Sequence, residues 1–198
     1  MRGQKPAPLP YLEIGTAEAK AFLSDLSWAV EFDVQNRKRM LDLVTEVLHR
    51  HTNSGCECTE YFDVTHNLIT FETHLGKRLI VHRKGAMPAE AGRPGVIPGS
   101  MGTASYLVEG LGNSASYASC SHGAGRALSR GEAQRRIRVK DFRRQMSHVV
   151  YPEGTWMEKA LIEEAPEAYK DIKAVLEQQH DLVKPILRLE PLMVLKGG

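Results

Sequence analysis

The stretch from Thr16 to Arg50 contains neither glycine nor proline, and it restricts the possible folds more than any other part of the chain. Apolar residues recur along it at the spacing of one helical face: Phe22, Leu26, Ala29 and Val30, then Leu41, Val44 and Leu48. Thr16 is a suitable N-cap, and Glu18 lies in the first turn, where the helix dipole favours an acid. The sequence therefore predicts one long helix, or two in succession, with one side packed on a core.

The spacing of the apolar residues changes after this predicted helix. Leu68 to His74 and Arg78 to Arg83 are short runs rich in β-branched and aromatic residues, and Leu75-Gly76-Lys77 separates them, which predicts a β-hairpin. Gly85 to Gly102 holds five of the 17 glycines and three of the 10 prolines, a composition that disfavours a helix. Thr103 to Val108 then reads as a strand.

Helical patterns return after Gly123. The clearest helix begins at Pro166, which suits a first helical turn, and its predicted inner side carries Tyr169, Ile172 and Leu176. Ile186 to Lys196 alternates enough to predict a strand. Helices and strands are mixed without regular βαβ alternation, and we find no repeat and no internal boundary. The predicted class is α+β, in a single domain of mixed helices and short sheets.

Composition excludes several classes of protein. With 42% hydrophobic residues in 198, the chain can bury a core and is not predicted to be disordered. The sequence contains no run of about 18 uncharged apolar residues, so no membrane span is predicted. Met1 to Pro10 is Pro-rich and predicts an extended arm, not a signal peptide. Three cysteines argue against a disulfide framework and favour the cytoplasm. Lys and Arg number 26 against 24 acids, so any nucleic-acid contact needs a local basic patch.

Two glycine-punctuated segments could hold a phosphate. In Pro98 to Ser105, small residues let a ligand approach the backbone, and exposed amides can form an anion nest. In Ser119 to Arg130, a histidine precedes a Gly-Ala-Gly turn that is predicted to open a helix, as phosphate binding at a helix N-terminus requires. Arg126 and Arg130, four apart, would then share a helix face. Plain structural turns remain the alternative.

His122 has two interpretations. A lone histidine is most often packed or solvated. Here small residues precede it and Gly-Ala-Gly-Arg follows it, so a neutral ring nitrogen could attack a phosphorus atom and form a phosphoramidate.

The remaining histidines and cysteines give weaker indications. His66 and His74 could ligate a metal, but their spacing matches no compact zinc pattern, and Cys56-Glu57-Cys58 is one residue too short for the usual pair. His82 to Gly85 is a compact basic cluster that could hold a phosphate or could simply be a solvated hairpin end.

Four segments, taken in order, resemble the RtcB family of RNA ligases: Asp63-Val64-Thr65-His66-Asn67, His82-Arg83-Lys84-Gly85-Ala86, Pro98-Gly99-Ser100-Met101-Gly102, and Ser121-His122-Gly123-Ala124-Gly125-Arg126-Ala127-Leu128-Ser129-Arg130. Glu164-Ala165-Pro166 through Tyr169-Lys170-Asp171 and the final Lys196-Gly197 look like that family's C-terminus. The resemblance runs from about Tyr11 to Gly198. It implies an RtcB-like C-terminal half at residues 11–198 behind an arm at residues 1–10.

The resemblance implies an activity. Family members join RNA ends that bear a 3′-phosphate or 2′,3′-cyclic phosphate to 5′-hydroxyl ends, using GTP and manganese (Mn²⁺). His122 would be the nucleophile that takes GMP from GTP, and the amides of Gly123 to Gly125 would stabilise the transferring group.

The same resemblance implies the surrounding site. The guanylate would contact Asn67, Pro98, Gly99, Ser100, Met101, Ser105, Gly123, Ala124, Gly125, Tyr169 and Lys196. His66 would bind manganese, and Lys84, Arg126 and Arg130 would hold RNA or terminal phosphates.

One departure from the family pattern concerns the metal. Members are about twice this length, and their N-terminal half supplies an Asp, a Cys and an Asn-His-Phe segment that have no match here. Only His66 can be matched to a manganese ligand, so we expect either a partner that supplies the other half or a homo-oligomer. The alternative is a catalytically silent GMP- or RNA-binding module derived from such a ligase. A purely structural or regulatory partner is a third possibility.

Overall fold

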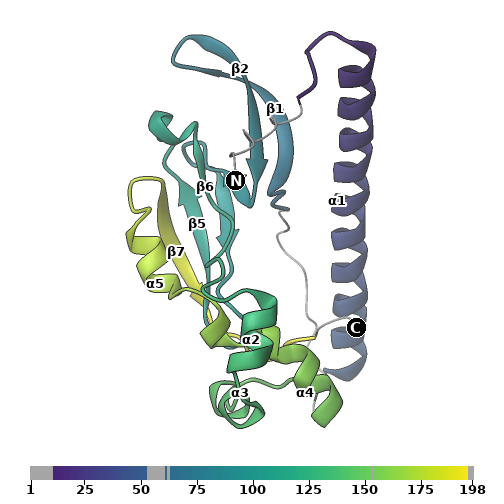
Figure 1. Cartoon of the computed structure of the whole chain (residues 1–198), viewed down its shortest axis with the longest axis vertical. Helices are drawn as coiled ribbons and strands as arrows, with labels where there is room; N and C mark the ends of the chain where they lie inside the picture. The colour runs from purple at the N-terminus through teal and green to yellow at the C-terminus, as the bar shows by residue number, and fades with distance from the viewer. Residues whose placement is uncertain (1–10, 53–60, 62, 153, 196–198) are drawn as a thin grey trace, which may run out of the picture.

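A computed structural model describes residues 11–52, 61, 63–152 and 154–195 of the chain. It begins with a single long helix, α1 (Ala17–His51), which runs along one side of the molecule (Figure 1). The Thr16 side chain caps it by accepting a hydrogen bond from the backbone N–H of Ala19. The predicted helix and its N-cap are confirmed. The predicted arm at residues 1–10, Cys56, Cys58 and Lys196 lie outside the described residues.

The predicted packing of α1 is wrong for most of its length. Of its residues, all of them described, Ala19 alone is buried. Trp28 and Phe32 are 71% and 61% exposed and stack on each other with ring centroids 5.7 Å apart. Arg37 ties the middle of the helix to the rest of the chain through a two-pronged ion pair with Asp63. Periodicity identified the helix correctly, but its apolar residues mostly face solvent.

The predicted hairpin is confirmed. Strand β1 (Asn67–His74) pairs antiparallel with β2 (Lys77–Lys84), with Asn67 opposite Lys84. Leu75 and Gly76 form the turn, both with positive φ, as two-residue hairpin turns of the favoured hand require. Lys77, predicted in the connection, begins β2 instead.

Two further small sheets follow the hairpin. Strand β3 (Ala86–Pro88) pairs with β6 (Ser119–Ser121). The other sheet has the antiparallel order β4 (Pro94–Ile97), β5 (Ser105–Gly110) and β7 (Val183–Leu189). The predicted strand at 103–108 is therefore present with shifted ends. The C-terminal strand begins and ends earlier than the predicted 186–196.

Short helices fill the second half of the chain. These are α2 (Arg130–Arg136), α3 (Val139–Gln145), α4 (Thr155–Leu161) and α5 (Ile172–Glu177), with 3₁₀ turns η1 (Ser114–Ser116), η2 (Ile162–Glu164) and η3 (Pro166–Ala168). The single helix predicted from Pro166 is wrong. Pro166 does start a helical turn, but Tyr169 forms a bridge with Arg126, which draws the chain out of the helix before α5 begins.

Two clusters of buried side chains form the core of this α+β fold. One surrounds Phe142 and Met146 among the short helices, and the other surrounds Met87, Ile97 and Val183 between the small sheets. Tyr169 packs against both clusters. Within the described part of the chain, no helix is long and apolar enough to cross a membrane.

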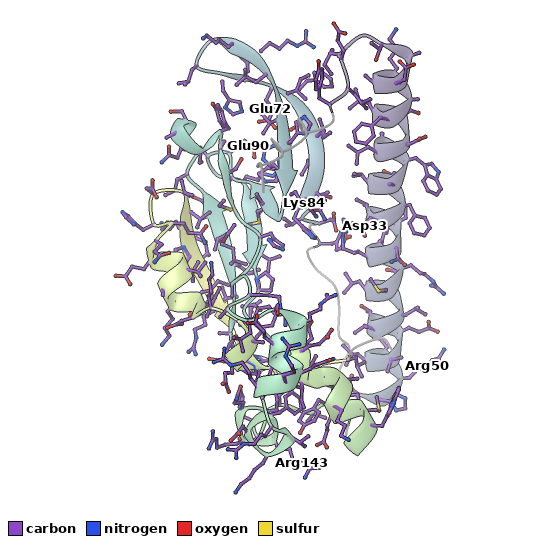
Figure 2. The ribbon with its side chains drawn as sticks, viewed as in Figure 1. Asp33, Arg50, Glu72, Lys84, Glu90 and Arg143 are labelled. Atoms are coloured by element: carbon purple, nitrogen blue, oxygen red, sulfur yellow. The ribbon has the colours of Figure 1, made fainter. Side chains whose placement is uncertain are left out.

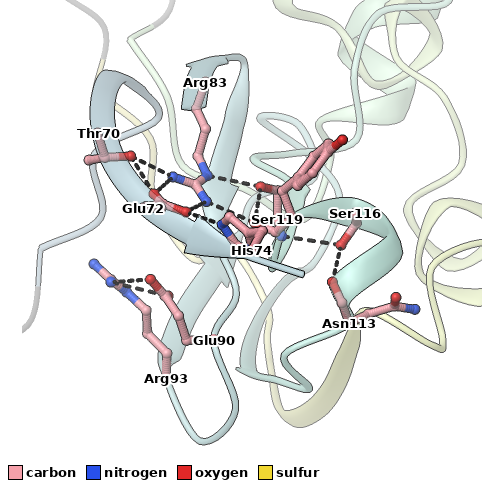
Figure 3. A network of polar contacts seen from close by, with 10 residues as sticks. Thr70, Glu72, His74, Arg83, Glu90, Arg93, Asn113, Ser116 and Ser119 are labelled. Carbon is pink, nitrogen blue, oxygen red and sulfur yellow. Dashed lines mark hydrogen bonds and ion pairs between the residues drawn. The ribbon is translucent and has the colours of Figure 1, made fainter. Parts of the chain in front are cut away.

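Arg83, a buried residue of β2, forms an ion pair with Glu72 of β1 and also hydrogen-bonds Ser119 of β6 (Figure 3). Arg83 is 3% exposed, and its guanidinium donates to both carboxylate oxygens of Glu72. It also donates to the Ser119 hydroxyl at 2.9 Å and to the Tyr117 carbonyl at 3.0 Å. Hydrogen bonds from Arg83, above all, lower the pKa of Glu72 to about 2.

This ion pair predicts an acid-dependent stability. A carboxyl whose pKa is depressed on folding contributes stability above its unfolded pKa, and that contribution is lost as pH falls toward the folded value. We expect the free energy of unfolding of the wild type to exceed that of Glu72→Gln near neutral pH, and the difference to shrink from about pH 4.5 to about pH 2. Urea unfolding across this range measures it, with Glu90→Gln as the exposed control; a pH-independent difference would contradict it.

Candidate functional site

His122 stands immediately after β6 with its ring orientation fixed. Its Nδ1 atom lies 2.7 Å from the backbone carbonyl oxygen of Gly85. A carbonyl oxygen only accepts hydrogen bonds, so Nδ1 carries the proton and donates it. In the neutral ring, Nε2 then keeps its lone pair and is the nitrogen able to act as a nucleophile.

Gly85 supports this arrangement through its backbone. Its φ is +66°, and a Cβ atom there would lie 3.3 Å from Cε1 of His122. Its N–H donates to the carbonyl of His66 at 2.9 Å, with the Asn67 side-chain oxygen also within reach at 3.2 Å. In this structure, Asn67 thus holds the turn that orients His122.

His66 stacks on His122, with ring centroids 4.6 Å apart and planes 16° from parallel. Burial of the ring and the neighbouring His122 lower the pKa of His66. A lowered pKa keeps the imidazole neutral at pH 7, the form in which it can ligate a metal. Lys84, at the end of β2 on the side toward α1 (Figure 2), adds a positive charge that acts in the same direction.

A cavity of about 640 Å³ opens beside His122. Its lining gathers residues from both glycine-punctuated segments and from the C-terminal part of the chain: Pro98, Gly99, Ser100, Met101, His122, Gly123, Ala124, Gly125, Arg126, Arg130, Glu164, Tyr169 and Val194. The structure therefore brings together ten of the other predicted site residues around His122. The cavity is large enough for a drug-sized ligand.

Three of the predicted binding residues lie outside this lining. Ser105 is in β5, opposite Leu189 of β7, and Asn67 and Lys84 flank the His66 side of His122. Lys196 falls outside the described residues. Two lining residues were missed. In the sequence, Glu164 is only part of a segment that resembles the family's C-terminus, and Val194 is only part of a predicted strand; neither carries a sequence signal for a pocket.

The backbone of the first segment is held by close contacts. The Thr103 hydroxyl lies 2.7 Å from the backbone N of Ser100 and accepts its hydrogen bond. A Cβ atom on Gly99 would approach the Ala104 carbonyl oxygen to 2.3 Å, so this position requires glycine.

The second segment differs from its prediction in two ways. The Gly-Ala-Gly turn does not open a helix, because α2 begins only at Arg130, behind a capping box formed by Ser129 and Glu132. The Ala124 amide donates to the Pro98 carbonyl at 2.9 Å and so is not available to a ligand in this structure. Arg126 and Arg130 share no helix face either, although both line the cavity.

A cluster of polar side chains forms one wall of the cavity. The Tyr169 hydroxyl donates to Glu164 at 2.5 Å, and Arg126 lies 3.2 Å from that hydroxyl and 3.4 Å from Glu164. The guanidinium carbon of Arg126 sits 5.0 Å from the centre of the Tyr169 ring. Burial, followed by Glu164, raises the pKa of Tyr169 to about 12, so it remains a protonated donor at neutral pH.

No complete metal site is found among the described residues: none of their His, Cys, Asp or Glu side chains gather in a group of three. His66 is the candidate ligand nearest the nucleophile. A single imidazole does not hold a divalent cation tightly.

Comparisons with known proteins agree on one family. A family model described as "tRNA-splicing ligase RtcB" matches residues 4–197. The chain is 39% identical over 194 residues to the RNA-splicing ligase RtcB of Escherichia coli (strain K12), covering 96% of this chain and 47% of that protein. It is 34% identical over 215 residues to the tRNA-splicing ligase RtcB of Nanoarchaeum equitans (strain Kin4-M), covering 96% and 45%. The chain thus spans about half the length of the curated relatives it matches.

Proposed function

Because the chain belongs to the RtcB ligase family, we propose that it acts in GTP-dependent joining of RNA ends and carries the histidine that becomes guanylated. Its RNA substrates would bear a 3′-phosphate or a 2′,3′-cyclic phosphate at one end and a 5′-hydroxyl at the other. The observation that carries this proposal is the contact of His122 Nδ1 with the Gly85 carbonyl, which leaves Nε2 as the nucleophile beside the cavity.

The proposed reaction has three steps. Nε2 of His122 attacks the α-phosphorus of GTP, an N–P bond forms, and pyrophosphate leaves. An oxygen of the RNA 3′-phosphate then attacks the same phosphorus and breaks the N–P bond, which activates the RNA end; a 2′,3′-cyclic end enters this step after water opens its P–O2′ bond. In the last step the 5′-hydroxyl, losing its proton to a base, attacks the RNA phosphorus and displaces GMP.

The chain's own residues support the first step by positioning. The Gly85 carbonyl fixes the tautomer of His122, and the stacked His66 restricts the ring from one face. Arg126 and Arg130 supply positive charge at the cavity for phosphate oxygens. Because the Ala124 amide is already bonded, the amides of Gly123 and Gly125 are the candidates for stabilising the transferring group.

Manganese does not fit the described residues as a complete site, because no three of their His, Cys, Asp or Glu side chains come together. His66 is the one matched residue that could contribute a ligand. The remaining ligands would come from polypeptide outside the described residues, in the same chain or in another.

The exposed side of α1 supports such a complement. Trp28 and Phe32 stack on its surface, and a hollow of about 710 Å³ lies along its C-terminal half, lined by Leu41, Tyr61 and mostly polar neighbours. Large apolar side chains exposed together, as Trp28 and Phe32 are, mark interaction surfaces. The occupant we propose is polypeptide corresponding to the half of the relatives that this chain does not cover; a homo-oligomer is the competing arrangement.

A second candidate function is a catalytically silent GMP- or RNA-binding module. The observation that favours it is the single candidate metal ligand beside His122. Incubation with labelled GTP and manganese separates the two candidates. Covalent label on His122, from the chain alone or with its complement, supports the ligase, whereas reversible nucleotide binding without label in either case supports the silent module.

Filling the cavity with a larger side chain should weaken nucleotide binding, whether the chain is a ligase or a silent binding module. We expect Val194→Trp, at the cavity wall, to lower the affinity for GTP at least about tenfold, because the larger ring occupies space that the nucleotide needs. Leu192→Trp is the matched control, since Leu192 is 80% exposed and does not line the cavity. Isothermal titration measures both variants. Equal affinities would place the nucleotide elsewhere.

A further inference from the structure

The surface formed by α2 and α3 carries an unusual density of positive charge. Between residues 130 and 148 there are seven basic side chains, all exposed, against two acids: the basic residues are Arg130, Arg135, Arg136, Arg138, Lys140, Arg143 and Arg144. We call these seven residues the α2–α3 basic surface. The whole chain has a net charge of only +2, so the charge is concentrated locally. Six of the seven are arginines, whose guanidinium groups match phosphate oxygens in a two-pronged geometry.

Part of this charge is neutralised within the fold. Arg138 and Arg144 share the single carboxylate of Asp141, at 2.9 and 3.3 Å. Arg143 pairs with the buried Glu158 at 2.7 Å, and Arg130 lies 3.6 Å from Glu163.

Three cations of the surface have no such partner. Among the residues that the structure describes, Arg135, Arg136 and Lys140 form no ion pair. Neighbouring exposed cations on one surface repel one another, and a bound polyanion would relieve that repulsion.

The basic surface continues directly from the cavity beside His122. Arg130 lines the cavity and is also the first residue of α2. One turn further on, Gln134 contacts Glu163 of η2, the turn that also supplies Glu164 to the cavity wall. From there α2 leads to α3 at the far end of the molecule (Figure 1), where Arg143 projects outward (Figure 2).

The apolar residues of the two helices and of the residues that end them face inward, and Val139 is partly buried against the same core. Their apolar residues Ala133, Ile137, Phe142 and Met146 are buried in the core. A helix that inserts into a membrane surface needs an exposed apolar face, so this surface is not built for lipid. It has the electrostatic character of a groove or face that follows a nucleic-acid backbone.

We propose that the α2–α3 basic surface binds the phosphate backbone of single-stranded RNA and leads its end into the cavity beside His122. The inference rests on the proposed function in taking RNA as the substrate, and it adds where the strand runs beyond its reactive end. Arg135, Arg136 and Lys140 are the contacts with the largest share of unneutralised charge.

The test uses the full chain and fluorescence anisotropy with a labelled RNA of about 16 nucleotides ending in a 3′-phosphate. The variant combines Arg135→Gln, Arg136→Gln and Lys140→Gln. Its matched control combines Lys20→Gln, Lys173→Gln and Lys184→Gln, which removes the same charge from exposed positions elsewhere. Circular dichroism melts verify that both are folded.

We expect the surface variant to bind the RNA about tenfold or more weakly, and the control to change by less than about twofold. The slope of log affinity against log salt should become shallower by about 2, because each lost phosphate contact to a single strand removes about 0.7. With an RNA of about 4 nucleotides the two variants should differ little, since a short end reaches only the cavity.

Several results would overturn the inference: no RNA binding by the wild type, equal losses in the two variants, or equal competition by polyglutamate or by anionic vesicles. Guanylation by labelled GTP is measured in parallel. If the protein is guanylated but the two variants bind RNA equally well, the inference fails and the proposed function stands. If only the surface variant loses RNA binding and neither the wild type nor either variant is guanylated, the proposed nucleophile is wrong and the inference stands.

Discussion

Replacing His122 with alanine should abolish the transfer of GMP from GTP to the protein, with residual label at least about 10³-fold below wild type. The side chain supplies the attacking atom, and truncation to alanine removes that atom from the cavity wall. Its Nδ1 proton is committed to the Gly85 carbonyl, so only Nε2 can form the N–P bond. Labelled GTP with manganese, followed by denaturing electrophoresis, measures the covalent adduct.

The control for this experiment is His180→Ala. His180 also places Nδ1 against a backbone carbonyl, that of Glu177 at 2.9 Å, but it is exposed and does not line the cavity. It should keep the full label. If wild type and His122→Ala incorporate equally little label, both alone and with the N-terminal half of a full-length relative, the proposed nucleophile is lost.

Local patterns in the sequence predicted the secondary structure better than the packing. The Gly- and Pro-free run after Thr16 and the Leu75-Gly76 turn each specify a backbone shape through short-range sterics, and both are present. The burial of α1 was mispredicted because hydrophobic periodicity says which residues share a face, not whether another element covers that face. Phe22, Leu41, Val44 and Leu48 belong to the predicted face and are 37% to 48% exposed in this structure.

The candidate site was predictable where its residues are close in sequence. The two glycine-punctuated segments meet because the Ala124 amide bonds the Pro98 carbonyl, and both line one cavity. The helix expected at Gly-Ala-Gly fails for a long-range reason: Arg126 pairs with Tyr169, more than 40 residues away, and stays extended. Glu164 and Val194 enter the same wall through such distant contacts, which spacing along the chain does not reveal.

Replacing Arg83 with methionine should lower the free energy of unfolding by about 3–5 kcal/mol, the largest stability effect that we expect in this chain. Arg83 is buried and donates to Glu72, Thr70, Ser119 and the Tyr117 carbonyl (Figure 3). Methionine keeps much of the aliphatic volume but removes the Arg83 charge from the Glu72 carboxylate, which is only 19% exposed and keeps the Thr70 hydroxyl and His74 as its polar neighbours. Urea unfolding monitored by circular dichroism measures the change.

Figure 3 also contains the matched control. Arg93 and Glu90 form an ion pair at 3.2 Å, but both side chains are 48% exposed, so solvent screens their attraction. Arg93→Met should therefore cost at most about 1 kcal/mol. If Arg83→Met and Arg93→Met unfold at the same urea concentration, the buried pair contributes no more than a surface one and the assignment is wrong.

A double variant identifies the cause of the loss. If the lost counter-charge of Glu72 dominates the cost, Arg83→Met combined with Glu72→Met should be more stable than Arg83→Met alone, because removing both charges removes the desolvation penalty. If the bonds to Ser119 and Tyr117 dominate instead, the double variant should be no more stable than the single one. Ser119 opens β6, and His122 follows directly after that strand. In that second case the loss of Arg83 should also loosen His122 and reduce guanylation in protein that remains folded.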